Sequence, residues 1–142
     1  MAVEERIVLR YVGRPSSTDM KELTDWFIKV FDLGGKEDGL EPSIFKEIIA
    51  NNTEGKGVTS KALTKKLDVP RSTVIYHLNR LIYSGLVVRK STRYYLRSED
   101  MHGTIEELHA DMEREFSRMM QFADMMDKMF EDSIYARRKQ KR

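Results

Sequence analysis

The 142-residue sequence predicts a mainly helical α+β fold that carries one small β-hairpin. Three observations predict it. Most apolar residues recur at the three- and four-residue spacing of amphipathic helices. The stretch 86–96 reads instead as two short strands around a polar turn. From Asp100 to about Arg137 a single helical pattern continues without a break.

Pattern and charge divide the chain into four segments. We expect a strand-and-helix extension over 1–41 and a central domain over 42–98. A long helix is predicted over 99–137, followed by a basic tail over 138–142.

Composition excludes several classes of protein. The chain has no cysteine, which excludes disulfides and thiolate metal sites and fits a cytoplasmic setting. No secretory signal and no apolar run of about 18 residues is present, so we expect no membrane association. No glycine-rich phosphate loop, nucleophile elbow or pair of catalytic carboxylates appears, which argues against an enzyme, and we expect no cofactor.

In the extension, alternation over 6–12 predicts a strand whose half-buried face holds Ile7, Leu9 and Tyr11. Candidates for the N-cap of the next helix are Ser16, Ser17 and Asp19. The apolar stripe of that helix consists of Met20, Leu23, Trp26, Phe27, Val30 and Phe31. We expect Gly34 and Gly35 to end it.

The central domain begins with a helix from about Pro42 to Ala50, whose buried face is Ile44, Phe45, Ile48 and Ile49. A short helix over 60–67 is capped by Thr59, and a tight turn leads into a helix from Pro70 to about Ser84. A hairpin with its turn at Ser91–Thr92 follows.

The helix that begins at Pro70 has two different faces at 100° per residue. Its inner face consists of Val74, Leu78, Leu81 and Ile82. Its outer face consists of Ser72, Tyr76, Asn79, Arg80 and Tyr83, with Arg71 and Thr73 in the first turn. Such an outer face suits a DNA major groove, where the first turn meets base edges and the flanks meet phosphates. His77 lies beside the inner face and is assigned to packing or to a phosphate contact.

Charge is distributed unevenly along the chain. The window 56–97 holds ten Lys and Arg against Asp68 alone, a net charge of +9. By contrast, 1–41 carries −3 and 101–134 carries −6, while the last six residues carry +5. A polyanion-binding module between acidic elements has this pattern, and ordinary solvated charge is the alternative.

The run "STV-x-x-HL-x-x-L-x-x-x-GLV" and the basic hairpin with "YYL" resemble the winged helix-turn-helix of bacterial and archaeal transcriptional regulators, closest to the ArsR type. The resemblance implies a homodimer that binds a roughly palindromic operator in double-stranded DNA, although MarR- and PadR-like regulators share the pattern. The expected DNA contacts are Thr59, Ser60, Lys61, Arg71, Ser72, Thr73, Tyr76, His77, Asn79, Arg80, Arg89, Lys90 and Arg93. A winged helix that binds only proteins of the transcription machinery is the alternative. The sequence identifies no effector.

Some ArsR-type proteins bind metals, which raises the question of a metal site. The cysteine ligands of that family are absent here. Oxygen and nitrogen ligands are available from Asp100, His102, His109 and Glu113, but their spacing departs from the family pattern. We therefore predict no metal site.

The long helix carries an apolar stripe with a mean spacing near 3.6 residues, which predicts a fairly straight helix. Additional methionines and Phe122 widen that face beyond what one neighbour covers. We expect it to pack against the same helix of a second subunit and against the helix over 20–31, with intrachain packing alone as the alternative. The predicted dimer interface consists of Trp26, Phe27, Ile105, Leu108, Met112, Phe116, Met119 and Met126.

Overall fold

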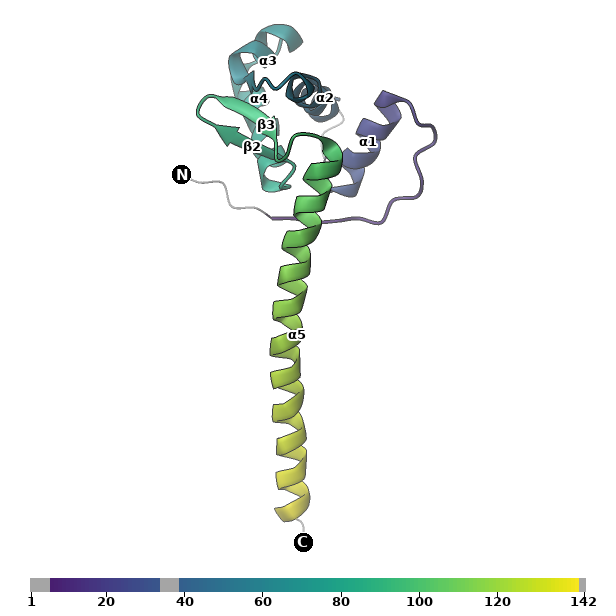
Figure 1. Cartoon of the computed structure of the whole chain (residues 1–142), viewed down its shortest axis with the longest axis vertical. Coiled ribbons are helices and arrows are strands. Elements are labelled where there is room, and N and C mark those ends of the chain that lie inside the picture. The colour runs from purple at the N-terminus through teal and green to yellow at the C-terminus, as the bar shows by residue number, and fades with distance from the viewer. Residues whose placement is uncertain (1–5, 34–38, 141–142) are drawn as a thin grey trace. The chain divides into compact units, whose positions relative to one another are not determined.

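The computed structural model describes residues 6–33 and 39–140, and the chain divides into two compact units, Met1–Ile105 and Glu106–Arg142. Within the described ranges there are five α-helices and one three-stranded antiparallel sheet (Figure 1). This confirms a mainly helical fold with a small β component. No helix in those ranges is both long enough and apolar enough to cross a membrane.

The first unit contains all the strands and most of the helices. In order, its elements are α1 (Met20–Val30), α2 (Leu40–Thr53), β1 (Val58–Thr59), α3 (Ser60–Leu67), α4 (Arg71–Tyr83), β2 (Val87–Lys90), β3 (Arg93–Leu96) and the first turn of α5 (Met101–Gln140). Helix α2 packs against α1, α4 and β3, and α4 also packs against α3 and β2. The β2–β3 hairpin therefore lies beside α4 (Figure 1).

The predicted hairpin is confirmed, and the sheet contains one strand more than predicted. The strand order is β1-β3-β2, with Val58 of β1 opposite Tyr94 of β3. A two-residue strand is too short to show any alternation, which is why β1 escaped the sequence pattern. At the hairpin tip Ser91 adopts φ 59°, the left-handed conformation of a tight two-residue turn.

The strand predicted over 6–12 is wrong. Among the described residues the segment has no strand partner; the N–H of Arg6 donates to the Tyr83 carbonyl (2.7 Å) and the N–H of Arg10 to the Val30 carbonyl (2.8 Å). Tyr11, placed on the buried face by the alternation, is 99% exposed. Alternation marks a strand only where a sheet edge is available, and here the amides bond to carbonyls at helix ends instead.

Helix α1 begins as predicted but buries a different face. The N–H of Glu22 and the hydroxyl of Ser17 donate to the Asp19 carboxylate, which confirms the N-cap and lowers the pKa of Asp19 below its usual value. The buried side chains are Thr24, Ile28 and Phe31, while Met20 is exposed. Because α1 docks on α2 through this narrow face, Phe31 is the one member of the predicted stripe that is buried, and its other members are half-buried or exposed.

The helix ends depart slightly from the prediction. Helix α1 stops at Val30, and the predicted terminator Gly34–Gly35 lies outside the described residues. Helix α2 runs from Leu40 to Thr53, beyond both predicted ends. The cap of α3 is confirmed, since the Thr59 hydroxyl accepts the N–H of Ala62 at 3.1 Å.

The core of the first unit joins α2, α3, α4 and the sheet. It buries most of the predicted inner residues of α2 and α4, whereas Ile49 and Ile82 are half-buried. Its fully or almost fully buried apolar members are Ile44, Phe45, Ile48, Leu63, Val74, Leu78, Leu81, Leu86, Val87, Tyr94 and Leu96. Burial of each such side chain contributes about 1.5–3 kcal/mol to folding, which fixes the backbone of α4 and the hairpin.

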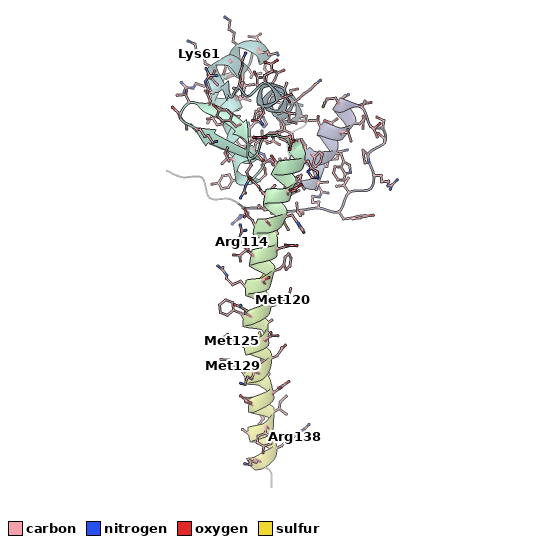
Figure 2. All side chains as sticks on the ribbon, viewed as in Figure 1. Lys61, Arg114, Met120, Met125, Met129 and Arg138 are labelled. Atoms are coloured by element: carbon pink, nitrogen blue, oxygen red, sulfur yellow. The ribbon has the colours of Figure 1, made fainter. Side chains whose placement is uncertain are left out.

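The second unit is the remainder of α5, a single helix described as far as Gln140. Its large apolar side chains are unusually exposed; they are Phe116, Met119, Met120, Phe122, Met125, Met126, Met129, Phe130, Ile134 and Tyr135. Figure 2 labels Met120, Met125 and Met129, which project from the helix. A helix with this much apolar surface needs a further partner to cover it.

Candidate nucleic-acid interface

Helix α4 presents its first turn to solvent and its later apolar residues to the core. Val74 and Leu78 are fully buried, which confirms the predicted inner face. Arg71 and Ser72 are exposed, and Tyr76 is 42% exposed one turn later. The core therefore fixes a helix whose first two side chains, Arg71 and Ser72, are available to a ligand.

Three further predicted DNA contacts, Thr59, Ser60 and Lys61, lie at the start of α3. Thr59 and Ser60 are half-buried, and the Thr59 hydroxyl accepts the N–H of Ala62 at the start of α3. Lys61 is exposed and projects from α3 (Figure 2). A lysine on an exposed first turn can reach phosphates but cannot fork onto a base edge as arginine does.

The hairpin holds two cations over tyrosine rings. The Arg89 guanidinium lies 5.8 Å from the centroid of Tyr94, and the Lys90 ammonium lies 5.5 Å from that of Tyr95. Arg89 Nε also donates to the Ser91 carbonyl at 2.9 Å. Tyr94 is buried and Tyr95 half-buried, because consecutive residues of a strand point to opposite faces of the sheet. Both cations remain exposed at the tip.

A third cation, Arg93, connects the hairpin to β1. Its Nη1 donates to the Gly57 carbonyl at 2.9 Å, and its side chain is otherwise exposed. A Cβ at Gly57 would lie 2.5 Å from Cζ of Tyr95 and 2.7 Å from Cβ of Arg93. Only glycine allows this close approach between β1 and the hairpin.

Two predicted DNA contacts, His77 and Arg80, both bind Glu41: His77 is buried there, whereas the Arg80 side chain stays 30% exposed. The side chain of His77 is only 3% exposed, with Nδ1 at 3.1 Å from Oε1 of Glu41, so it packs in the core and cannot reach a phosphate. Arg80 Nε donates to the same carboxylate oxygen. Burial lowers the pKa of Arg80, but the hydrogen bond and charge of Glu41 outweigh it and raise that pKa above its usual value.

Glu41 is a structural residue that the sequence pattern did not reveal. It lies in the first turn of α2 and is 1% exposed. A glutamate beside Pro42 at a helix start looks like an ordinary favourable charge on the helix dipole. Its burial follows from the packing of α2 on α4. The spacing of apolar residues within one helix cannot reveal an ion pair between two helices whose paired residues are 39 positions apart in the sequence.

Asn52 is a second such residue. Its Nδ2 donates to the carbonyls of Ser98 (3.0 Å) and Glu99 (2.8 Å), and its Oδ1 accepts the N–H of Leu96 at 3.0 Å. One side chain thus ties the end of α2 to the chain that leaves β3. It fixes the hairpin relative to the helices.

The remaining predicted contacts differ in exposure. Thr73 and Asn79 of α4 are half-buried.

The predicted dimer residues also differ in exposure. Half-buried are Trp26, Phe27, Ile105 and Met112; Leu108 is buried; and Phe116, Met119 and Met126 are exposed. Trp26 Nε1 donates to the Gly13 carbonyl at 2.7 Å.

The candidate metal ligands do not form a cluster. His109 Nε2 lies 3.3 Å from Oε1 of Glu113, and both side chains are largely exposed. Over 6–33 and 39–140, no group of three or more His, Cys, Asp or Glu side chains is arranged to hold a metal ion.

Comparisons with known protein families, with curated proteins and with solved structures found no match.

Proposed function

We propose that the chain is a sequence-specific regulator of transcription that binds double-stranded DNA as a homodimer. In this proposal α2, α3, α4 and the β2–β3 hairpin form a winged helix-turn-helix similar to the ArsR type. Helix α4 enters the major groove and the hairpin contacts the adjacent minor groove or backbone.

One observation carries the proposal: the first turn of α4 and the hairpin tip are both exposed and basic within one compact unit. Over 56–97, which includes both features, Asp68 is the only acidic residue against ten Lys and Arg. Such a local excess attracts a polyanion, and a module that binds only proteins has no need of it.

The side chains then divide by role. In α4, Arg71 can fork onto a guanine edge, and Ser72 and Tyr76 can donate to or accept from neighbouring bases. In the hairpin, Arg89 and Lys90 suit phosphates or a narrow minor groove. His77 has no contact with DNA in this proposal, because it is buried against Glu41, and Arg80 holds α4 to the same carboxylate.

The homodimer is supported by the apolar face of α5. Its exposed phenylalanines and methionines form a stripe that the described residues of the second unit leave open to solvent. A second copy of the helix covers such a stripe by symmetric packing. A two-fold dimer binds two DNA half-sites that are related by the same symmetry. The centres of these half-sites lie about 34 Å apart, one helical turn, so that both major grooves face the same side of the duplex.

Selection from a pool of random DNA duplexes tests this proposal. We expect enrichment of an inverted repeat, and loss of that enrichment when Arg71→Ala replaces the natural chain. Lys21→Ala, an exposed lysine of α1, is the matched control and should select the same repeat. The proposal fails if no sequence is enriched; absence of any DNA binding at low salt would favour a protein-binding module.

A further inference from the structure

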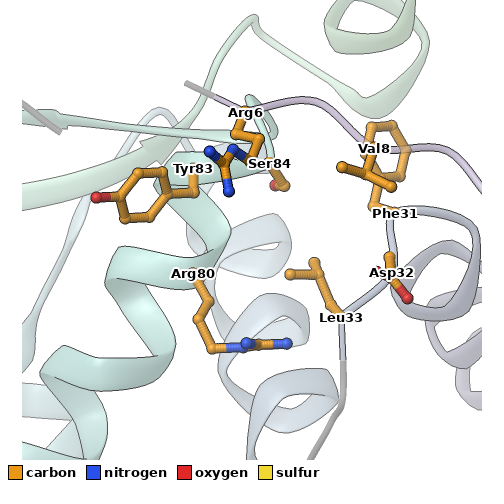
Figure 3. A pocket seen from close by; sticks show the side chains of 8 residues that line it. All are labelled: Arg6, Val8, Phe31, Asp32, Leu33, Arg80, Tyr83 and Ser84. Atoms are coloured by element: carbon orange, nitrogen blue, oxygen red, sulfur yellow. The ribbon is translucent and has the colours of Figure 1, made fainter. Parts of the chain in front are cut away.

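A pocket of about 570 Å³ opens between the N-terminal segment, the end of α1 and the end of α4. Figure 3 shows Val8, Phe31 and Leu33 on one side of it and Arg6, Arg80 and Tyr83 on the other. This volume is in the range of small-molecule sites. The pocket lies away from the exposed first turn of α4, so its role differs from base recognition.

The cationic side of the pocket suits an anion. Arg80 is held in place by Glu41 and keeps 30% of its side chain exposed. Arg6 is exposed, and among 6–33 and 39–140 no acidic side chain pairs with it. Asp32 also lines the pocket, but its carboxylate lies 3.5 Å from Arg10 Nη1, which offsets its charge. Two guanidinium groups at one opening are a good receptor for a carboxylate.

The opposite side suits an apolar group. Val8 is 43% exposed although it is apolar, and Leu33 is half-buried. Phe31, which is buried in the core, also lines this side of the pocket. A ligand that covers these side chains removes apolar surface from water, at a gain of about 25 cal/mol per Å².

We propose that this pocket binds a small organic anion, a carboxylate attached to an aromatic or branched apolar body. The carboxylate lies between Arg6 and Arg80, and the apolar body lies on Val8 and Leu33.

Binding there acts on α4 directly. Tyr83 and Arg80 belong to the last turn of α4, and Arg80 is tied to Glu41 of α2. A bound carboxylate competes with Glu41 for the Arg80 guanidinium and so changes how α2 holds α4. This effect on DNA affinity rests on the proposed function, whereas anion binding does not.

Calorimetric titration of the full chain without DNA tests the site. The probes are benzoate and phenylacetate, each compared with its neutral amide, benzamide and phenylacetamide. We expect at least one carboxylate to bind at least about tenfold more tightly than its amide, because the amide cannot pair with two guanidiniums. Equal binding of acids and amides, or no binding of either acid at about 50 mM, overturns the proposal.

Matched variants locate the site. Arg6→Gln removes a pocket cation and should weaken carboxylate binding at least about fivefold, since Arg6 is exposed and its loss leaves the core intact. Arg14→Gln changes an exposed arginine of the same segment outside the pocket and should leave affinity within about twofold. Equal effects of the two variants would place binding elsewhere and overturn the proposal.

Coupling to DNA is measured separately. The tighter carboxylate should change DNA affinity at least about threefold in the natural chain and not in Arg6→Gln. Unchanged DNA affinity in a chain that binds the anion overturns the coupling alone. Anion binding in a chain that binds no DNA supports the site and overturns the proposed function.

Discussion

At the scale of single residues, Glu41 determines how α4 is held. One buried carboxylate contacts His77 and Arg80, two side chains that come from the inner edge of the same helix. A buried charge is retained only when paired, and removal of one partner leaves the others unsatisfied. The tie therefore fixes the rotation of α4, which decides where Arg71 and Ser72 point.

Glu41→Gln tests this tie. We expect a loss of about 1–3 kcal/mol in the free energy of unfolding, below the full value for a buried pair because Arg80 is partly exposed. Urea denaturation measures it. Glu47→Gln, which breaks the exposed 2.9 Å pair with Lys66, is the control and should cost less than about 1 kcal/mol. Equal losses in the two variants would show that burial of Glu41 has no special weight.

A second prediction separates base reading from phosphate contact. Arg71→Ala should weaken binding to the selected operator by about 1–3 kcal/mol and reduce discrimination against altered sequences. Lys90→Ala should weaken all duplexes by a similar factor, since a lysine at the hairpin tip contacts the backbone. Fluorescence anisotropy with operator and scrambled duplexes measures both. If Arg71→Ala weakens every duplex alike, its base-reading role is wrong.

At the scale of elements, the close approach between β1 and the hairpin fixes the position of the basic tip. In Gly57→Ala the new Cβ would lie 2.5 Å from Cζ of the Tyr95 ring and 2.7 Å from Cβ of Arg93. Both distances are far below van der Waals contact, so the strands must separate. We expect a loss of about 1–3 kcal/mol in unfolding free energy. Gly13→Ala is the control, because its Cβ meets open space. A neutral Gly57→Ala would show that β1 and the hairpin move apart at no cost.

The elements also show how far sequence patterns reach. The ends of α3 and α4, the Thr59 cap and the hairpin turn follow from local chemistry, namely capping residues, a proline and alternating strands. The strand expected over 6–12 failed because pairing depends on a distant edge that the local pattern cannot show. The inner face of α1 failed for the same reason, since its docking on α2 selected Thr24 and Ile28 over larger side chains.

The candidate site divides in the same way. The exposed face of α4 and the basic hairpin follow from periodicity and charge. The ties made by Glu41 and Asn52 connect residues far apart in the chain, so only the packed structure reveals them. The helical periodicity places Arg80 outside the apolar stripe of α4, which predicted a DNA contact. The arginine side chain is long enough, however, to turn back and bind Glu41.

At the scale of the whole molecule, the exposed face of α5 predicts a dimer. Sedimentation equilibrium should give twice the chain mass of 16.7 kDa. Phe116→Glu together with Met126→Glu should give monomers, because four buried carboxylates per dimer would be unpaired. Ser117→Glu together with Gln121→Glu adds the same charge on the polar face and should keep the dimer. A monomeric natural chain contradicts the dimer.

The central claim is that this chain binds DNA through its basic helix and hairpin, and the salt dependence of DNA affinity tests it most directly. We predict that log K against log salt falls with a slope steeper than about −4, since each neutralised phosphate contributes about −0.9. Lys90→Ala should make the slope shallower by about 2 per dimer, and Lys21→Ala should leave it unchanged. A slope near zero, or no binding at about 50 mM salt, would contradict the claim.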